Sequence, residues 1–183
     1  MKNAQKIDLK TDKMYATRIS IPADKRTPLV ALLNQQLANL TDLYSQTKFA
    51  HWNVKGMHFI ALHKLFDELA EKVEDAGDEV AERATALGGV AHGTTRMAAT
   101  SSQLAEFDAA SFEGVDVVAA VADRFAAVGA SVRKAIDAAD DLDDTATADL
   151  LTGVVEMLDQ SLYFLESHVQ RPAQTQTQRT AQR

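Results

Sequence analysis

One segment of the chain, from about residue 58 to residue 87, carries two pairs of side chains that can bind a metal ion. His63 precedes Asp67 by four positions, and Asp78 precedes Glu82 by four. In a helix this spacing places both members of a pair on one face. Imidazole and carboxylate ligands suit iron in both its ferrous and ferric states, and they also accept zinc. Each pair alone is weak evidence, because an acid one turn from a histidine is more often a solvated helix face.

The arrangement of the two pairs says more than either pair alone. At about 100° per residue the apolar side chains of this segment form one stripe that faces away from both pairs. The stripe consists of Leu62, Leu65, Phe66, Leu69, Val73, Ala76, Val80, Ala84 and Leu87. The pairs are 15 residues apart, which separates them by about 22 Å along a helix. One chain therefore cannot close a site from both pairs. Two copies packed antiparallel across a two-fold axis bring the first pair of each chain to the second pair of the other, which makes two equal sites.

Composition limits the chemistry that this chain can perform. With 183 residues it fits one domain, and it has no cysteine, so disulfides, thiolate catalysis and iron–sulfur clusters are excluded. The net charge of −7 argues against the body of the protein being a nucleic-acid surface. No apolar run approaches the roughly 20 residues that span a bilayer, and the first residues do not resemble a secretory signal. We expect a soluble, cytoplasmic protein.

The elements that must position these residues are long helices. Only three prolines and eight glycines interrupt a sequence that is rich in alanine and leucine. Capping residues and glycines predict four long helices and one short helix, over residues 27–54, 58–87, 96–101, 115–139 and 144–168. The short first connection and the long crossover between the second and third long helices favour a ferritin-like four-helix bundle. The E-x-x-H motif of larger ferritins is absent, which argues against a di-iron centre inside the bundle.

A further histidine lies near the first pair. His51 is five residues before Gly56 and His63 is seven residues after it, so both lie at a similar height beside the same predicted turn. On its own helix, however, His51 falls close to an apolar stripe. From the residues alone, a buried hydrogen-bonded histidine and a metal ligand are equally good interpretations.

Four stretches form recognisable motifs: AHWNVKG at 50–56, FIALHKLFDEL at 59–69, DEVAERATALGGVAHGTT at 78–95 and TADLL at 147–151. They resemble the Dps family, dodecameric mini-ferritins that protect DNA during starvation. The resemblance implies an all-α, ferritin-like bundle with a short helix in its crossover, built from two-fold dimers into a hollow shell. It also implies that one subunit supplies the first three metal ligands and its two-fold partner the last two. These ligands are His51, His63, Asp67, Asp78 and Glu82.

The same resemblance implies ferroxidase activity and iron storage. Ferrous ions are oxidised, preferably by hydrogen peroxide, without release of hydroxyl radical, and the ferric product mineralises inside the shell. Trp52, the only tryptophan, is adjacent to His51. The resemblance implies that its indole can give an electron to the oxidising centre, and ordinary interface packing is an equally good interpretation.

An acidic cluster lies where the last two long helices meet. In similar proteins such residues line three-fold pores that attract Fe(II), and the candidates are Asp143, Asp144 and Asp149. The alternative interpretation is that these acidic residues stabilise a helix N-terminus through the helix dipole, and this interpretation is sufficient to explain Asp144. The remaining histidines, His58, His92 and His168, are interpreted as surface or loop residues.

Both ends of the chain are expected to be tails flanking a bundle over residues 27–168. The N-terminal tail comprises residues 1–26. The C-terminal tail, residues 169–183, is rich in Gln and Thr, which cannot build a core, and it is expected to be disordered. Their basic residues are candidates for DNA contacts: Lys2, Lys6, Lys10, Lys13, Arg171, Arg179 and Arg183. Twelve copies of each tail combine many weak contacts, and would associate the protein with the nucleoid. The alternative function is therefore a mainly architectural, DNA-condensing protein.

Overall fold

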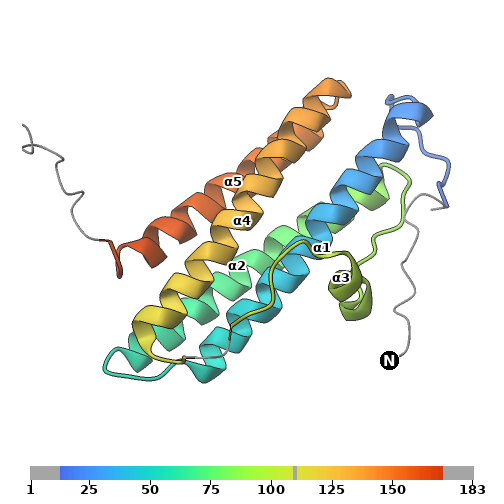
Figure 1. Cartoon of the computed structure of the whole chain (residues 1–183). Helices are drawn as coiled ribbons and strands as arrows, with labels where there is room; N and C mark the ends of the chain where they lie inside the picture. Colours follow the sequence, from blue (N-terminus) through green and yellow to red (C-terminus); the bar gives the residue numbers. More distant parts are fainter. Residues whose placement is uncertain (1–12, 109–110, 171–183) are drawn as a thin grey trace, which may run out of the picture.

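The structure, a computed structural model, describes residues 13–108 and 111–170 (Figure 1). Its helices within these ranges are α1 (Ala23–Asn53), α2 (Phe59–Ala86), α3 (Thr95–Ser101), α4 (Gly114–Asp141) and α5 (Thr145–Glu166). The predicted four long helices and the short helix in the crossover are confirmed in number and order. In the part of the chain that the structure describes, no helix is both long enough and apolar enough to span a membrane.

The long helices form two antiparallel hairpins, α1 with α2 and α4 with α5, which lie against each other (Figure 1). Their apolar faces meet in one core of mainly leucine, valine and alanine, in which Phe66 and Phe125 are the largest fully buried side chains. The crossover from α2 to α4 returns along the outside of α1, and α3 packs there. This course leaves one side of α2 uncovered by the chain's own core.

The start of α1 differs from the prediction. The helix begins at Ala23, four residues before the expected start at Thr27 and Pro28. The Pro22 carbonyl accepts a 3.0 Å hydrogen bond from the backbone N–H of Arg26, and the Arg26 guanidinium donates to two further backbone carbonyls. These bonds close the first turn upstream of Pro28. The proline then lies inside the helix, where it removes one backbone hydrogen bond.

The turn between α1 and α2 sets the relative height of the two helices. Val54 leaves α1 in an extended conformation, and Gly56 has a φ of +102°, which a side chain would strain. The Lys55 N–H donates a 2.8 Å hydrogen bond to the carbonyl of Phe112, which ties the end of the crossover to the turn. The last turn of α1 is therefore held beside the first turns of α2.

Candidate metal centre

His51 and His63 meet at this turn, as their similar predicted height requires. Their rings are stacked, with centroids 3.8 Å apart and an angle of 21° between the planes. His51 is only 9% exposed, whereas His63 is partly buried. The Phe59 ring lies 5.2 Å from that of His63 on the same helix. The two imidazoles thus occupy a shielded position at the edge of the bundle.

Each histidine is oriented by the backbone of the other helix. His51 Nδ1 is 2.6 Å from the carbonyl oxygen of His63, and His63 Nδ1 is 2.9 Å from the carbonyl oxygen of His51. A carbonyl can only accept, so Nδ1 carries the proton in both rings. In the neutral imidazoles the lone pair then lies on Nε2. A hydrogen bond from the second ring nitrogen to a carbonyl is the usual support of a metal-binding histidine.

Asp67 adds a carboxylate beside the two imidazoles on this side of the molecule. It lies one helical turn after His63, and its carboxylate is 3.8 Å from His51 Nδ1. The Lys48 ammonium forms a hydrogen-bonded ion pair with this carboxylate. That hydrogen bond, above all, lowers the pKa of Asp67 below its ordinary value. The carboxylate is therefore ionised at neutral pH and is paired with the Lys48 ammonium.

Lys48 was not identified from the sequence. The only available signal was its position three residues before His51, which places both on one face of α1. Its ion pair joins residues that are 19 positions apart, a contact that helical periodicity does not reveal. Lys48 therefore places a positive charge against one carboxylate of the candidate site.

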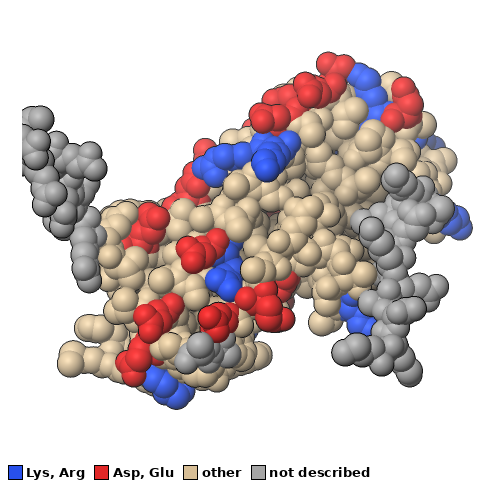
Figure 2. Space-filling view, in the orientation of Figure 1, with Lys and Arg blue, Asp and Glu red and all other residues tan. Residues whose placement is uncertain are grey.

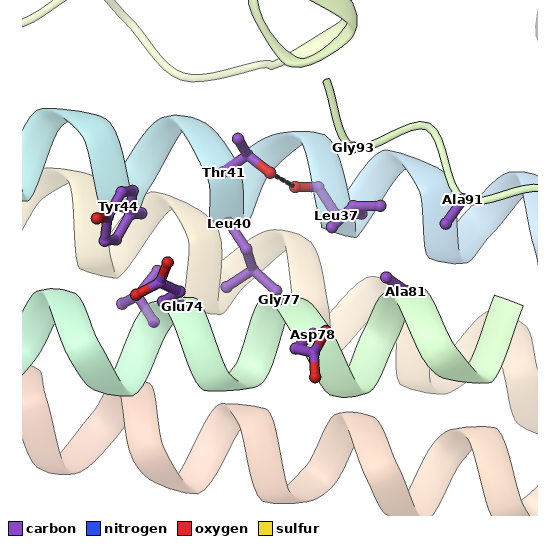
Figure 3. A pocket seen from close by; sticks show the side chains of 11 residues that line it. Leu37, Leu40, Thr41, Tyr44, Glu74, Gly77, Asp78, Ala81, Ala91 and Gly93 are labelled. Carbon is purple, nitrogen blue, oxygen red and sulfur yellow. Dashed lines mark hydrogen bonds between the residues drawn. The ribbon is translucent and has the colours of Figure 1, made fainter. Parts of the chain in front are cut away.

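Asp78 and Glu82 lie farther along α2, and both are exposed. Asp78 lines a cavity of about 370 Å³ between α1 and α2 (Figure 3). Within residues 13–108 and 111–170, no group of three or more His, Asp or Glu side chains is close enough to hold a metal ion. The chain thus presents the two predicted halves of a site at separate places. Their union across a two-fold axis stays a prediction.

Trp52 lies at the surface beside His51, with 64% of its area exposed. An exposed indole next to a candidate ligand is compatible with either of its two interpretations, contact with another subunit or electron donation.

The three acidic residues near the start of α5 have different environments. Asp144 is 3% exposed and accepts two hydrogen bonds from the Arg83 guanidinium, at 2.8 and 2.9 Å. It also caps α5 by accepting from the Thr147 N–H, as the helix-terminus interpretation predicted. Asp143 is exposed and pairs with Lys25, and Asp149 is exposed. The carboxylates of Asp144 and Asp143 are thus both engaged within the subunit, the first buried and the second at the surface, and Asp149 is exposed.

The charge of Asp144 is maintained against its burial. Burial alone raises the pKa of this carboxyl group, but hydrogen bonds from Thr147 and Arg83 and the positive charge of Arg83 outweigh it. The net effect lowers the pKa below its ordinary value. Arg83, which the sequence analysis did not single out, therefore joins the end of α2 to the start of α5.

The remaining predicted residues lie apart from the histidine pair. His58 and His168 are exposed, whereas His92 lies in the crossover and is 9% exposed, so it is a buried loop residue. Lys13 lies over the Tyr15 ring, 4.9 Å from its centroid. The other basic residues proposed for the tails fall outside the described residues: Lys2, Lys6, Lys10, Arg171, Arg179 and Arg183.

Comparison with known proteins places this geometry in context. Residues 30–174 match the family model described as a ferritin-like domain. The DNA protection during starvation protein of Agrobacterium fabrum is 37% identical over 158 residues, which cover 86% of this chain and 98% of the relative. The protein of the same name from Halobacterium salinarum is 37% identical over 145 residues, covering 77% of this chain and 78% of the relative.

Solved structures agree with the fold. DpsA14 from Streptomyces coelicolor has a TM-score of 0.82 and 32% identity, and the match covers 87% of this chain and 94% of that one. An archaeal Dps homologue from Halobacterium salinarum has a TM-score of 0.81 and 28% identity, covering 90% of this chain and 92% of that one. The predicted ferritin-like bundle with a short middle helix is thereby confirmed.

Proposed function

Because this chain belongs to the Dps family of ferritin-like proteins, we propose that it is a ferroxidase that oxidises Fe(II) and stores the ferric product. The observation that carries this proposal is the stacked pair of His51 and His63. Each ring donates a hydrogen bond from Nδ1 to a backbone carbonyl, and the pair lies beside the ionised carboxylate of Asp67. This is an oriented donor set at the molecular surface, outside the apolar core.

The proposed site is completed by a second copy of the chain. Asp78 and Glu82 lie on the uncovered side of α2, about 22 Å along the helix from the first pair. Antiparallel packing of two α2 helices brings these carboxylates to the partner's histidines, and the two-fold symmetry makes two equal sites. We propose that such dimers assemble further into a dodecameric hollow shell, where the ferric mineral collects.

The donor set of the complete site favours iron chemistry. Two imidazoles and three carboxylates bind both Fe(II) and Fe(III), and zinc is a redox-inert competitor for the same ligands. Hydrogen peroxide is the proposed oxidant. Two ferrous ions give one electron each, the O–O bond breaks, and two protons are taken up to yield two water molecules and two ferric ions. The protein's own groups hold the cations and supply negative charge as the ferric state forms.

Anaerobic titration with Fe(II), followed by addition of peroxide, tests the function. We expect saturable binding, rapid oxidation with one peroxide consumed per two ferrous ions, and inhibition by Zn(II). Native mass measurement on the same sample should give twelve chains. Oxidation that does not saturate, or a monomeric mass, would contradict the proposal.

Lys48 gives a more specific prediction. Its ammonium occupies the Asp67 carboxylate that the incoming cation needs, so Lys48→Gln should strengthen Fe(II) binding. An increase of a few-fold at most is expected, because an ion pair that is partly exposed to solvent holds its partner only weakly. Isothermal titration under anaerobic conditions measures it. Lys72→Gln is the matched control, since Lys72 contacts Gln160 and the Phe164 ring instead. Weaker binding in Lys48→Gln would show that the lysine orients Asp67 for the metal.

The acidic end of the molecule is the proposed entry route for iron. Figure 2 shows acidic side chains gathered where α4 meets α5, a region that contains Asp143 and Asp149. In a shell, rings of such carboxylates from three subunits concentrate cations at a pore. Asp144 contributes to this route only by holding the start of α5.

DNA protection follows in part from the chemistry itself, because it consumes ferrous iron and peroxide together. Direct DNA binding through the basic tails is the second candidate function; the names of the two relatives above refer to DNA protection. The Tyr15 N–H donates a 2.7 Å hydrogen bond to the Gly88 carbonyl, which fixes where the N-terminal segment leaves the bundle. A gel shift that weakens steeply with salt and is lost without residues 1–12 would support this second function.

A further inference from the structure

The end of the crossover contacts the turn between the two helices that carry the histidine pair. Figure 1 shows the start of α4 beside this turn. The Phe112 carbonyl accepts a 2.8 Å hydrogen bond from the Lys55 N–H, and Lys55 pairs with Glu113 in an isolated parallel β-bridge. A side chain at Gly114 would lie 2.9 Å from Leu62 Cδ1 and 3.5 Å from the Lys55 carbonyl oxygen. The start of α4 therefore lies directly against the turn.

An aromatic contact joins the same segment to the last turns of α1. The centroid of the Phe112 ring lies 5.9 Å from that of the Phe49 ring, and the Phe107 ring lies 5.2 Å from Phe49 in an edge-on arrangement. Phe49 and Phe112 are partly buried against the core, and Phe107 is buried. Phe49 is two residues before His51, so the two side chains lie on opposite faces of α1. Phe112 thus supports α1 from behind this histidine.

The histidine pair depends on such support because the bonds that orient it are mutual. His51 Nδ1 donates to the His63 carbonyl at 2.6 Å, and His63 Nδ1 donates to the His51 carbonyl at 2.9 Å. Both bonds can form only at one relative height of α1 and α2. The end of a helix frays readily, since its last carbonyl groups have no partners within the helix. A contact that fixes the end of α1 therefore also fixes the direction of both Nε2 lone pairs.

We propose that Phe112 is a positioning residue for the metal site, an inference that rests on the proposed ferroxidase function. Its ring holds the last turns of α1 through Phe49, and its carbonyl holds the turn to α2 through Lys55. It acts through the backbone on either side of His51. The crossover thus contributes to metal binding without supplying a ligand.

Titration with Co(II) tests the proposal on the assembled protein, because the visible absorption of this ion depends on the geometry of its ligands. Phe112→Ala removes the ring contact and lets the end of α1 move. We expect the dissociation constant for Co(II) to rise about tenfold, the smaller end of what the loss of a ligand-orienting partner costs. The absorption bands should also shift, and KM for Fe(II) should rise by a similar factor.

Hydrogen exchange of the metal-free protein gives a second readout. The Lys55 amide donates to the Phe112 carbonyl, so it should exchange faster in Phe112→Ala than in the wild type. Amides in the middle of α4 should keep their wild-type rates, because local opening does not require the whole bundle to unfold.

Two variants serve as controls. Phe112→Tyr keeps the ring and should restore the wild-type values. Ile136→Ala is the matched control, since Ile136 is also partly buried against the core but lies near the far end of α4. Its Co(II) binding should equal that of the wild type. If Phe112→Ala does not fold, Phe112→Leu, which fills much of the same space without a ring, should show the same shifts at reduced size.

The outcomes separate this inference from the proposed function. If the wild type binds Co(II) and oxidises Fe(II), but Phe112→Ala, or Phe112→Leu in its place, has the wild-type dissociation constant and spectrum, Phe112 has no positioning role and the ferroxidase proposal stands. An equal loss in Ile136→Ala would also overturn the inference, because the effect would then reflect core packing in general. If the wild type neither binds Co(II) saturably nor oxidises Fe(II), the ferroxidase proposal itself fails.

Discussion

Replacing His63 with alanine should reduce peroxide-dependent Fe(II) oxidation by more than about 100-fold, because even the loss of a ligand's supporting partner typically costs 10–100-fold. The substitution removes one of the two imidazoles and also the Nδ1–H that donates to the His51 carbonyl. The remaining ring of His51 keeps its own hydrogen bond but loses its stacking partner. Stopped-flow absorbance of ferric product formation measures the effect.

His58→Ala is the matched control for this experiment. His58 lies five residues earlier, at the start of α2, and is exposed. Its side chain lies apart from the histidine pair, so its oxidation rate should equal that of the wild type. Equal loss of activity in both variants, or unchanged activity in His63→Ala, would remove the histidine pair from the mechanism.

Replacing Arg83 with alanine should produce the largest loss of stability among single polar changes. The variant leaves the Asp144 carboxylate, which is 3% exposed, without the two hydrogen bonds from the guanidinium. Removing one partner of a buried ion pair costs 3–5 kcal/mol, and we expect about 3 kcal/mol here because the Arg83 side chain is 18% exposed. Chemical denaturation of the assembled protein, at a fixed protein concentration, measures the change.

An exposed ion pair supplies the control. Arg133 pairs with Asp159, and their side chains are 52% and 50% exposed. Arg133→Ala should change stability by less than about 1 kcal/mol, as surface pairs do. A similar loss in the two variants would mean that the burial of Asp144 does not govern its contribution.

The ion pair between Arg83 and Asp144 also predicts how the stability of the fold depends on pH. The pKa of Asp144 is lower in the folded chain than in the unfolded chain, so the carboxylate stabilises the fold fully above its ordinary pKa. This contribution is lost as the pH falls through the lowered folded value. Arg83→Ala should therefore show a weaker decline of stability in acid than the wild type.

The sequence predicted the helices well because their signals are local. Glycines and apolar periodicity marked the ends of α2 and α4 to within two residues. The start of α1 was missed because Thr27 and Pro28 form a good local helix start. The actual start depends on hydrogen bonds from the Arg26 side chain, one of them to a carbonyl at the end of α2, and no local pattern encodes that contact.

The candidate site shows the same division between local and distant information. The spacing of His63 and Asp67 follows from helical periodicity, and their placement outside the core follows from the apolar stripe of α2. Lys48 could not be predicted, because its pairing with Asp67 depends on how two helices pack. The engagement of Asp144 by Arg83 depends likewise on residues 61 positions apart.

The structure also bears on the two interpretations of His51 that the sequence left open. His51 was equally a buried, hydrogen-bonded histidine or a metal ligand. It is buried and hydrogen-bonded through Nδ1, and this bond leaves Nε2 with the lone pair that a metal needs. The two interpretations are therefore compatible, and ligation by His51 remains part of the proposal.

Complementation between two inactive variants tests the intersubunit site most directly. Chains carrying His63→Ala and chains carrying Glu82→Ala are co-expressed with different tags, and assemblies that contain both are purified. Each mixed dimer has one site with both defects and one site with none, so random pairing should restore about a quarter of the wild-type sites. Fe(II) oxidation near that level, from two variants that are inactive alone, is the predicted result. Mixed assemblies of the correct mass that stay inactive would contradict the account, because both ligand sets would then have to come from the same chain.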